Sequence, residues 1–497
     1  MIIPAVVAGL LCVPELAGAQ VVRGNGADGK SSALSLLEEA DSSETPVQIT
    51  LEQALQIALS ENVSVKVADM EIERTGFAKK GTYASLFPQI DVSGAYQRTI
   101  KKQVMYMDFD MSSLAGGAAG AGGSGDAADG SQAGAGSSGQ APSSRSSGGL
   151  EVGRWNTYSA GVTAAMPIVN AQLWESLKIS GKGVELAVEQ ARASRLDMVT
   201  QVKQAFYSVL LAKEAFNVYK EVYENAVKNY EETEKKYNAQ KASELEMTRA
   251  KTTVANAIPS VYNAESSVIL AQWQLKAVIG VSLDLNLDAA GSLSDYADTM
   301  FYELHQHDSV SLANNTSMKQ LAIQAEQLAS TIRLQKYAYI PTLSAMFSFS
   351  MNAMTNDFNF DQYKWTPYSY VGISLAIPIF SGGKRYNDVR QAKNQYNQLM
   401  LRTEDTERNL KIAIRQSLNT METNMKSYYA AQTAVSAAQK GYDIAERAYQ
   451  VGRSTLIELN DAQLALTQAR LSESQAVYNF IVAKAQLEQV IGNDFIE

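Results

Sequence analysis

An internal duplication constrains this chain more than any other feature of its sequence. Residues 271–280 read AQWQLKAVIG and residues 483–492 read AKAQLEQVIG, at an offset of 212 residues. Matches at nearly the same offset pair Pro167 with Pro378, Tyr230 with Tyr442, and Tyr237 with Tyr449. Such a repeat means that one structural unit is used twice. We place the first repeat at 49–290 and the second at 291–497, after an extended segment at 20–48.

The first repeat is the longer one. Phe87-Pro88 and Ile340-Pro341 open the two strand regions at an offset of 253, so the first repeat carries about 41 extra residues. Residues 111–149 consist mainly of Gly, Ala and Ser and account for this excess. A segment of that composition buries no core, so it is predicted to be a flexible loop.

Each repeat contains a junction at which a strand passes into a long helix. Residues 370–385 read YVGISLAIPIFSGGKR, with apolar side chains alternating with small or polar ones before Pro378. Proline has no N–H to donate and is expected to end the strand. Gly382 and Gly383 then turn the chain into a helix that begins at Lys384. Residues 159–173 repeat this junction around Pro167.

The same order of elements is expected in each repeat: helix, two strands, long helix, turn, return helix. Residues 50–86 are predicted to be helical with Thr50 as N-cap, and the strands are expected at about 89–105, 154–166, 342–351 and 363–377. The helices at 171–237 and 386–449 lack proline, and apolar residues follow a heptad spacing that is typical of coiled coils. Their return helices are expected to end at Gly280 and Gly492. The predicted class is therefore mainly α with a β portion.

Four strands cannot close a barrel, and lipid does not tolerate an open sheet edge. The strands are therefore expected to be completed by other copies, and three copies would give a twelve-stranded membrane barrel. Tyr and Trp side chains crowd the strand ends. Two interpretations remain open: an aromatic girdle at the membrane interface, or the core of a soluble sheet.

Bulk properties exclude several classes of protein. The net charge of −9 gives no support for nucleic-acid binding. The single cysteine, Cys12, excludes a disulfide framework. Residues 1–19 are predicted to be a secretory signal peptide, cleaved before Gln20; alternatively, Cys12 is an acylated lipoprotein cysteine. No later run approaches the roughly 20 apolar residues of a membrane helix.

The chain resembles the TolC-like outer-membrane efflux proteins from about Ile49 onwards. The resemblance rests on residues 376–383 (AIPIFSGG), the tip at 449–455 (YQVGRST) and the duplicated Val-Ile-Gly ends. It implies a homotrimer in the Gram-negative outer membrane, with a twelve-stranded barrel and a helical tunnel extending into the periplasm. It also implies a periplasmic adaptor protein and an inner-membrane pump of the RND or ABC type, and a role in efflux or type I secretion.

The same resemblance implies a constriction just after the tip. Glu458 and Asp461 match the acidic positions of the family, and Glu246 is the counterpart of Glu458 in the first repeat. Two acidic residues three positions apart share a helix face, and three copies would form an acidic ring of the kind found in cation-selective pores. The alternative is an ordinary solvated helix face.

The resemblance further implies a tip that gates and docks. Tyr449 matches a tyrosine that holds the closed state, whereas Ser454, preceded by Arg453, stands where the family usually has an arginine. The adaptor-docking residues are predicted to lie at the two helical tips: Val451, Gly452, Arg453, Ser454, Gln240, Lys241 and Ser243. A plain interhelical turn is the alternative.

No pattern in the sequence indicates catalysis. His305 and His307 lack a third ligand at a spacing that suits zinc, and no nucleophile–base arrangement or phosphate loop is present. We therefore expect no metal, no cofactor and no enzymatic activity. The rival to an export duct is an exported structural coiled-coil protein of the cell envelope that transports nothing.

Overall fold

The computed structural model describes residues 46–105, 150–297, 311–358 and 363–493. Two compact units are present, and each draws on both sequence repeats. The strand unit comprises described residues within 81–174 and 336–385, and the helical unit those within 1–80, 175–335 and 386–497. The predicted signal peptide, Cys12, the 111–149 loop and both histidines lie outside the described residues.

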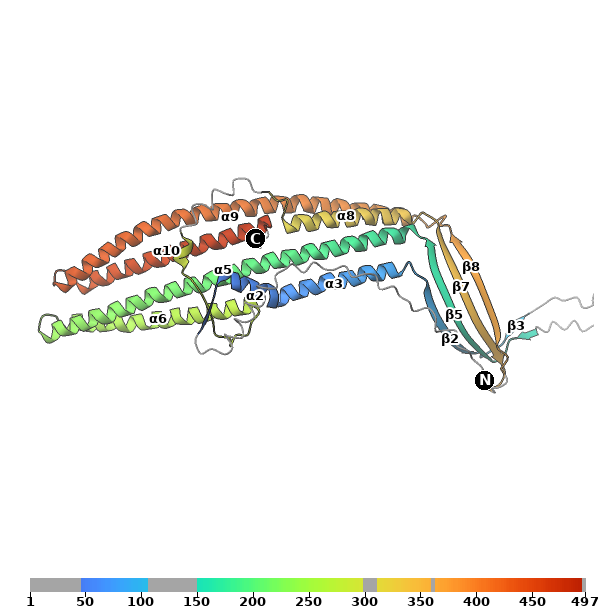
Figure 1. Cartoon of the computed structure of the whole chain (residues 1–497), viewed down its shortest axis with the longest axis horizontal. Helices are drawn as coiled ribbons and strands as arrows, with labels where there is room; N and C mark the ends of the chain where they lie inside the picture. The colour runs from blue at the N-terminus through green and yellow to red at the C-terminus, as the bar shows by residue number, and fades with distance from the viewer. Residues whose placement is uncertain (1–45, 106–149, 298–310, 359–362, 494–497) are drawn as a thin grey trace, which may run out of the picture. The chain divides into compact units, whose positions relative to one another are not determined.

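Four antiparallel strands form the sheet of the strand unit, in the order β2-β5-β7-β8 (Figure 1). Their bounds are β2 Gln89–Arg98, β5 Asn156–Val169, β7 Thr342–Thr355 and β8 Thr366–Ala376. Each repeat supplies a hairpin pair, β2 with β5 and β7 with β8, and the β5–β7 pair joins the two repeats. A separate short antiparallel pair joins β3 (Gln103–Met105) to β4 (Leu150–Val152), which come just before and just after residues 106–149 in the chain.

The two faces of this sheet differ in polarity, as the alternation in the sequence predicts. One row across the strands runs Ile90, Ala164, Phe347, Val371. The next row along the strands, on the other face, runs Asp91, Thr163, Ser348, Tyr370. The apolar face stays open to solvent in the single chain, with Val371 80% and Ile373 71% exposed.

The strand ends differ from the predicted ones. The segment predicted as one strand at 89–105 is divided into β2 and β3, and β7 extends to Thr355. Pro378 follows the end of β8 as expected, but Pro167 lies inside β5, so the expectation that it ends the strand was wrong. A shift of register between Pro167 and Val169 accommodates it, because a bulge needs no ladder hydrogen bond from the proline nitrogen.

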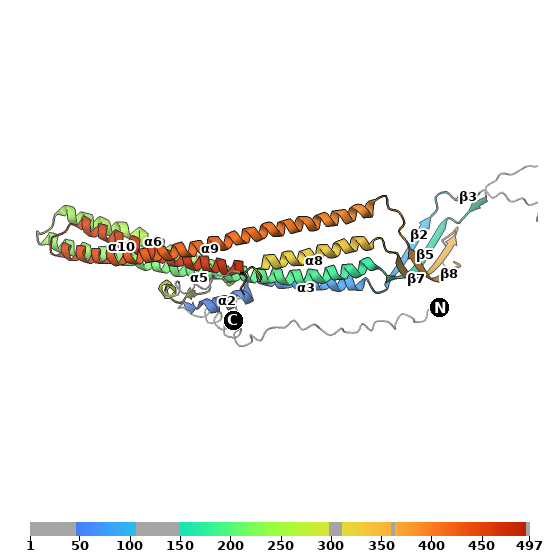
Figure 2. The same cartoon turned by 90° about the horizontal axis from the view of Figure 1, so that it is seen from above.

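Two helical hairpins dominate the helical unit, and their turns lie at the same end in both views (Figures 1 and 2). The first pairs α5 (Ala171–Asn238) with α6 (Glu244–Ile279), and the second pairs α9 (Lys384–Gln450) with α10 (Leu456–Ile491). α5 has 68 residues and α9 has 67, so each spans about 100 Å at about 1.5 Å per residue.

Shorter helices precede the strands of each repeat, namely α2 (Leu51–Glu61) and α3 (Val63–Ala84) in the first and α8 (Thr316–Tyr337) in the second. Thr50 caps α2 in a capping box with Gln53, which confirms the predicted N-cap. The single helix expected at 50–86 is interrupted at Asn62, whose extended backbone ends α2 (ψ 133°).

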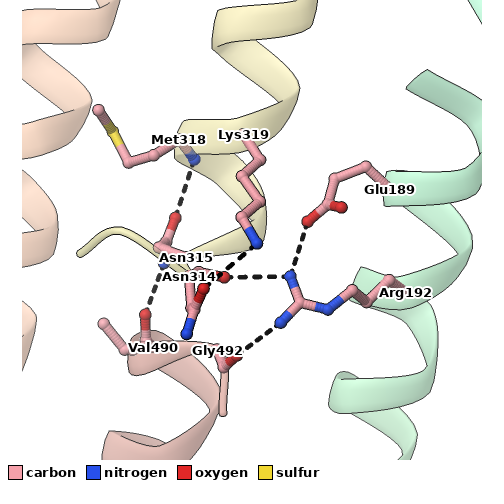
Figure 3. Close-up of polar contacts among 8 residues, drawn as sticks. All are labelled: Glu189, Arg192, Asn314, Asn315, Met318, Lys319, Val490 and Gly492. Atoms are coloured by element: carbon pink, nitrogen blue, oxygen red, sulfur yellow. Dashed lines mark hydrogen bonds and ion pairs between the residues drawn. The ribbon is translucent and has the colours of Figure 1, made fainter. Parts of the chain in front are cut away.

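The duplicated Val-Ile-Gly sequences form two equivalent joints. Asn62 Nδ2 donates to the carbonyl of Val278 at 2.7 Å, and Asn315 Nδ2 donates to that of Val490 at 2.6 Å. At the second joint Arg192 also donates to the carbonyl oxygens of Gly492 and Asn314, at 2.6 and 3.1 Å (Figure 3). Each asparagine therefore ties the end of a return helix to the start of α3 or α8.

The main apolar core of the helical unit lies beside a small parallel sheet of β1 (Val47–Ile49) and β6 (Leu287–Ala289). The short helix η1 (Leu293–Tyr296) follows β6 in the chain. Phe206 from α5, Ile279 from α6 and Phe480 from α10 are almost fully buried there. Throughout the ranges that the structure describes, no helix has the length and apolar character needed to cross a membrane.

Candidate functional site at the helical tips

Both hairpin tips have the same backbone turn. At the first tip the N–H groups of Gln240 and Lys241 donate to the carbonyls of Tyr237 and Lys236, at 2.8 and 2.7 Å. At the second tip Gly452 and Arg453 donate to Tyr449 and Ala448, at 3.1 and 2.7 Å. This pattern is the Schellman motif, which needs a left-handed residue after the helix.

The left-handed position is Gly452 in one tip and Gln240 in the other, with φ of 77° and 58°. The sequence shows Val-Gly only at the second tip, so equivalence of the two turns was not expected from the residues. A glutamine in this conformation stores about 1–2 kcal/mol of backbone strain. The first tip therefore reaches the same turn at a higher energetic cost.

A capping box starts each return helix. The Ser243 hydroxyl accepts from the N–H of Glu246 and the Glu246 carboxylate accepts from the N–H of Ser243, both at 3.2 Å. Thr455 and Glu458 make the same reciprocal pair at the start of α10. Glu246 and Glu458, the two glutamates predicted to line the constriction, thus also cap their helices. The S/T-x-x-E spacing in the sequence is the pattern that indicates such a capping box.

Tyr449 ties the second hairpin to the first. Its hydroxyl lies 2.5 Å from Thr233 Oγ1, and Lys236 Nζ donates to its carbonyl at 2.9 Å. The same ammonium lies 4.4 Å from the centre of the tyrosine ring. The side chain of Tyr449 is only 6% exposed, and this burial raises the pKa of its phenol. It therefore stays protonated and can remain a hydrogen-bond donor at neutral pH.

Burial on α5 near this tip differs from the predicted heptad seam. Farther from the tip, apolar residues at the heptad-like spacing, Val199, Val202, Phe206 and Val209, are buried as that spacing predicts, but Tyr237 at the end of α5 is 36% exposed. The buried positions there are small or polar: Ala226, Asn229 and Thr233. Of these, Thr233 lies against Tyr449, with 2.5 Å between their hydroxyl oxygens.

Further polar contacts link the two hairpins above the tip. Lys228 Nζ lies 2.9 Å from Glu446 Oε1, Asn460 Nδ2 donates to Thr253 at 3.2 Å, and Arg470 pairs with Glu221. The two ion pairs keep partly exposed side chains, and such pairs contribute roughly 0–1 kcal/mol each. Tyr449, which is buried, is therefore the principal polar tie at this end.

The predicted constriction residues Glu458 and Asp461 are both exposed on the first turns of α10. Glu458 accepts hydrogen bonds from the Ser454 hydroxyl and from the N–H of Thr455, and that from Ser454 is the main cause of its lowered pKa. Ser454 thus binds the glutamate of the capping box at the start of α10. Its neighbour Arg453 stays exposed.

All the predicted docking residues except the half-buried Ser454 are exposed at the two turns. Val451 is 69% exposed, and Gly452, Gln240 and Lys241 are also exposed.

At the strand-to-helix junction Gly382 and Gly383 take left-handed backbone, with φ of 60° and 81°. Across the described ranges, no group of three His, Cys, Asp or Glu side chains is placed to hold a metal ion.

Comparison with known proteins gives consistent matches. A model of the family described as "Outer membrane efflux protein" matches residues 54–281 and 309–493. The outer membrane protein TolC of Vibrio cholerae is 21% identical over 342 residues, which cover 67% of this chain and 76% of that protein. The alkaline protease secretion protein AprF of Pseudomonas aeruginosa is 22% identical over 355 residues, covering 68% and 70%.

A solved structure shows the same fold. The CmeC outer membrane channel of Campylobacter jejuni superposes with a TM-score of 0.64 at 18% identity, covering 91% of this chain and 89% of that one. The long helical hairpins and the antiparallel strands are thus those of the TolC-like channels.

Proposed function

The chain belongs to the outer membrane efflux protein family and is an outer-membrane channel of Gram-negative bacteria, and we propose that three copies form the export duct of a tripartite efflux or type I secretion system. In this proposal the duct is passive and catalyses no reaction. An adaptor protein in the periplasm opens its helical tips, and a separate inner-membrane pump of the RND or ABC type supplies the energy.

The four-stranded sheet carries this proposal. Its apolar face is exposed, and β2 and β8 end the order of strands, so that among the described residues each has a partner on one side only. Unpaired backbone groups in lipid cost several kcal/mol each. Pairing β8 of one copy with β2 of the next satisfies both edges, and three copies bring twelve strands, which is enough to close a barrel.

The tips are the proposed gate. Tyr449 holds the two hairpins of one copy together through Thr233 and Lys236, and an adaptor that binds Val451 and its neighbours can loosen this contact. Glu458 and Asp461, with Glu246 from the other tip, are proposed to line the constriction. The exposure of Glu458 and Asp461 and the negative charge of all three side chains support this assignment.

The names of the relatives indicate which kind of transport system the duct belongs to. AprF carries protease secretion in its name, which favours a secretion system for at least part of this family. The rival function, a structural coiled-coil protein without transport, receives no support from these relatives.

The native mass of the protein, extracted in detergent from the outer-membrane fraction, tests the proposal. A trimer that conducts ions in a planar bilayer is expected, since only closed strand edges are stable in lipid. A monomer or dimer in the soluble periplasmic fraction would remove the duct and leave the structural role.

A further inference from the structure

The internal duplication extends to the pairing of strands. An offset of 253 residues relates β2 to β7, and an offset of 211 relates β5 to β8, as the matched prolines require. In the first repeat Ile90 pairs with Ala164, and these offsets carry that pair to Leu343 and Leu375. Leu343 does pair with Leu375. The two hairpin pairs therefore have the same register, residue for residue.

Among the strands that the structure describes, the β5–β7 pair has no counterpart within one chain. It joins the second strand of one repeat to the first strand of the other. Its equivalent would join β8, the second strand of the second repeat, to β2, the first strand of a first repeat. Within the described sheet these two strands are the opposite edges, so the β2 strand that satisfies β8 belongs to another copy.

We propose that β8 of one copy pairs with β2 of the next copy in the register that β5 and β7 adopt within one copy. This inference rests on the proposed trimer and fixes its strand interface. Applying the offsets to three observed β5–β7 pairs places Ser374 opposite Ala95, Leu375 opposite Gly94, and Ile373 opposite Tyr96.

The polarity of the two faces agrees with this register. Ile373 and Leu375 lie on the apolar face of β8, and Gly94 and Tyr96 lie on the apolar face of β2. Ser374 is on the opposite face, as is Ala95. A slip of one residue would bring apolar side chains of one copy beside polar ones of the next. Registers that differ by two residues keep the faces matched and are the true competitors.

Exposure identifies the two edges as the surfaces left open in a single chain. Every residue of β2 is exposed, and β8 is exposed at nine of its eleven positions, whereas the inner strands β5 and β7 are mostly half-buried. An uncovered edge strand recruits another strand. A second copy of this chain supplies the only strand whose register the first copy already specifies.

Engineered disulfides test the register. Cys12 is the only cysteine of the sequence, so a Cys12→Ser background carries no other thiol. Directly opposed strand residues have Cα atoms about 4.5–5.5 Å apart, within reach of a disulfide, whereas diagonal neighbours lie about 7–8 Å apart, beyond it. Ser374→Cys with Ala95→Cys should therefore link the copies covalently into a trimer on a non-reducing gel.

The competing registers have their own pairs. Ser374→Cys with Ser93→Cys, or with Gln97→Cys, reports a shift of two residues in either direction, and each should give only traces of linked copies. The matched control is Thr163→Cys with Ser348→Cys, the observed pair at the same place in the β5–β7 ladder. It should form a disulfide within one chain and link no copies.

The outcomes separate the register from the trimer. Strong linkage through Ser93 or Gln97 would overturn the register, and so would an unlinked Ala95 pair in a detergent-extracted trimer whose control disulfide forms. If the unmutated chain shows no trimer by native mass, the proposed duct itself fails. Covalent trimers through the Ala95 pair alone support both.

Discussion

The Tyr449 hydroxyl makes a buried hydrogen bond between the two helical hairpins. Replacing Tyr449 by Phe removes the hydroxyl contact with Thr233 but keeps the ring beside Lys236. A lost hydrogen bond of this kind is worth about 1 kcal/mol, which is roughly a fivefold shift in a two-state equilibrium. We therefore expect Tyr449→Phe to raise the open probability about fivefold in single-channel recordings in a planar bilayer.

Tyr237 provides the matched control for this prediction. It occupies the same place in the first repeat, 212 residues earlier, but is partly exposed. Tyr237→Phe should leave the open probability near that of the unmutated channel. Equal effects of the two substitutions would show that the Thr233 contact does not hold the tip closed.

Ser454 stabilises the ionised form of Glu458 in the proposed constriction. Its hydroxyl donates to Glu458 and lowers the pKa of that carboxyl, so the carboxylate stays ionised to a lower pH than an ordinary glutamate. Ser454→Ala removes the donor and should raise the pKa of Glu458. Cation selectivity, measured from reversal potentials, should then be lost at a higher pH than in the unmutated channel as the pH falls.

Ser474→Ala controls for the loss of a serine hydroxyl on α10, because Ser474 bonds only to the backbone of Arg470 among its described contacts. Its selectivity should fall at the same pH as that of the unmutated channel. Superimposable pH profiles for both variants would place Glu458 outside the constriction.

Residue roles could be predicted from the sequence only where a local signal exists. The constriction role of the acidic positions and the gating role of Tyr449 were predicted by resemblance and stay predictions. The capping boxes of Ser243 and Thr455 could have been predicted from their S/T-x-x-E spacing. The partners of Tyr449 were not, because Thr233 and Lys236 lie on a helix more than 200 residues away. The left-handed backbone of Gln240 was not predicted, because glycine is the residue that normally indicates this conformation and only the second tip has one, Gly452.

At the scale of elements, the joints at Gly280 and Gly492 explain the repeated Val-Ile-Gly sequence. Gly492 has a φ of 76°, and a Cβ built there would lie 2.4 Å from the carbonyl oxygen of Asn314. Gly452 has nearly the same φ, 77°, but open space around it. The two glycines thus separate the cost of backbone conformation from the cost of a steric clash.

Gly492→Ala should therefore destabilise the helical unit more than Gly452→Ala. The left-handed backbone costs an alanine about 1–2 kcal/mol at either site, and crowding of the joint adds about 1–3 kcal/mol at Gly492 alone. Thermal unfolding followed by circular dichroism at the helix band measures the difference. Equal melting temperatures would mean that the joint can open without cost.

The order of helices and strands could be predicted from the periodicity of apolar residues and from the turn residues, but the residues at which each element begins and ends could not. The TolC-like fold class and the outer-membrane channel function predicted from the sequence are confirmed. Asn62 was hidden inside a continuous helical pattern, because it breaks the helix to bind Val278 in another element. The parallel pair of β1 and β6 was also missed, since three-residue strands carry no readable alternation.

At the scale of the whole molecule, the sheet and its apolar face decide where the protein lies. A lysine on the lipid-facing side of a membrane barrel costs about 2–4 kcal/mol near the midplane, whereas positions on the other face tolerate charge. Ile373 and Ser374 are neighbours on opposite faces of β8, and Ile373 is 71% exposed in the single chain. They form a matched pair for testing which face meets lipid.

Ile373→Lys should sharply reduce the amount of trimer recovered from the outer-membrane fraction, because each of three copies would place a charge in lipid. Ser374→Lys should leave that amount nearly unchanged, since its ammonium would lie on the polar face. Detergent extraction followed by native mass measurement gives the yields. The reverse ranking would mean that the polar face meets lipid, and equal yields would mean that neither face does, in which case the strands close no barrel.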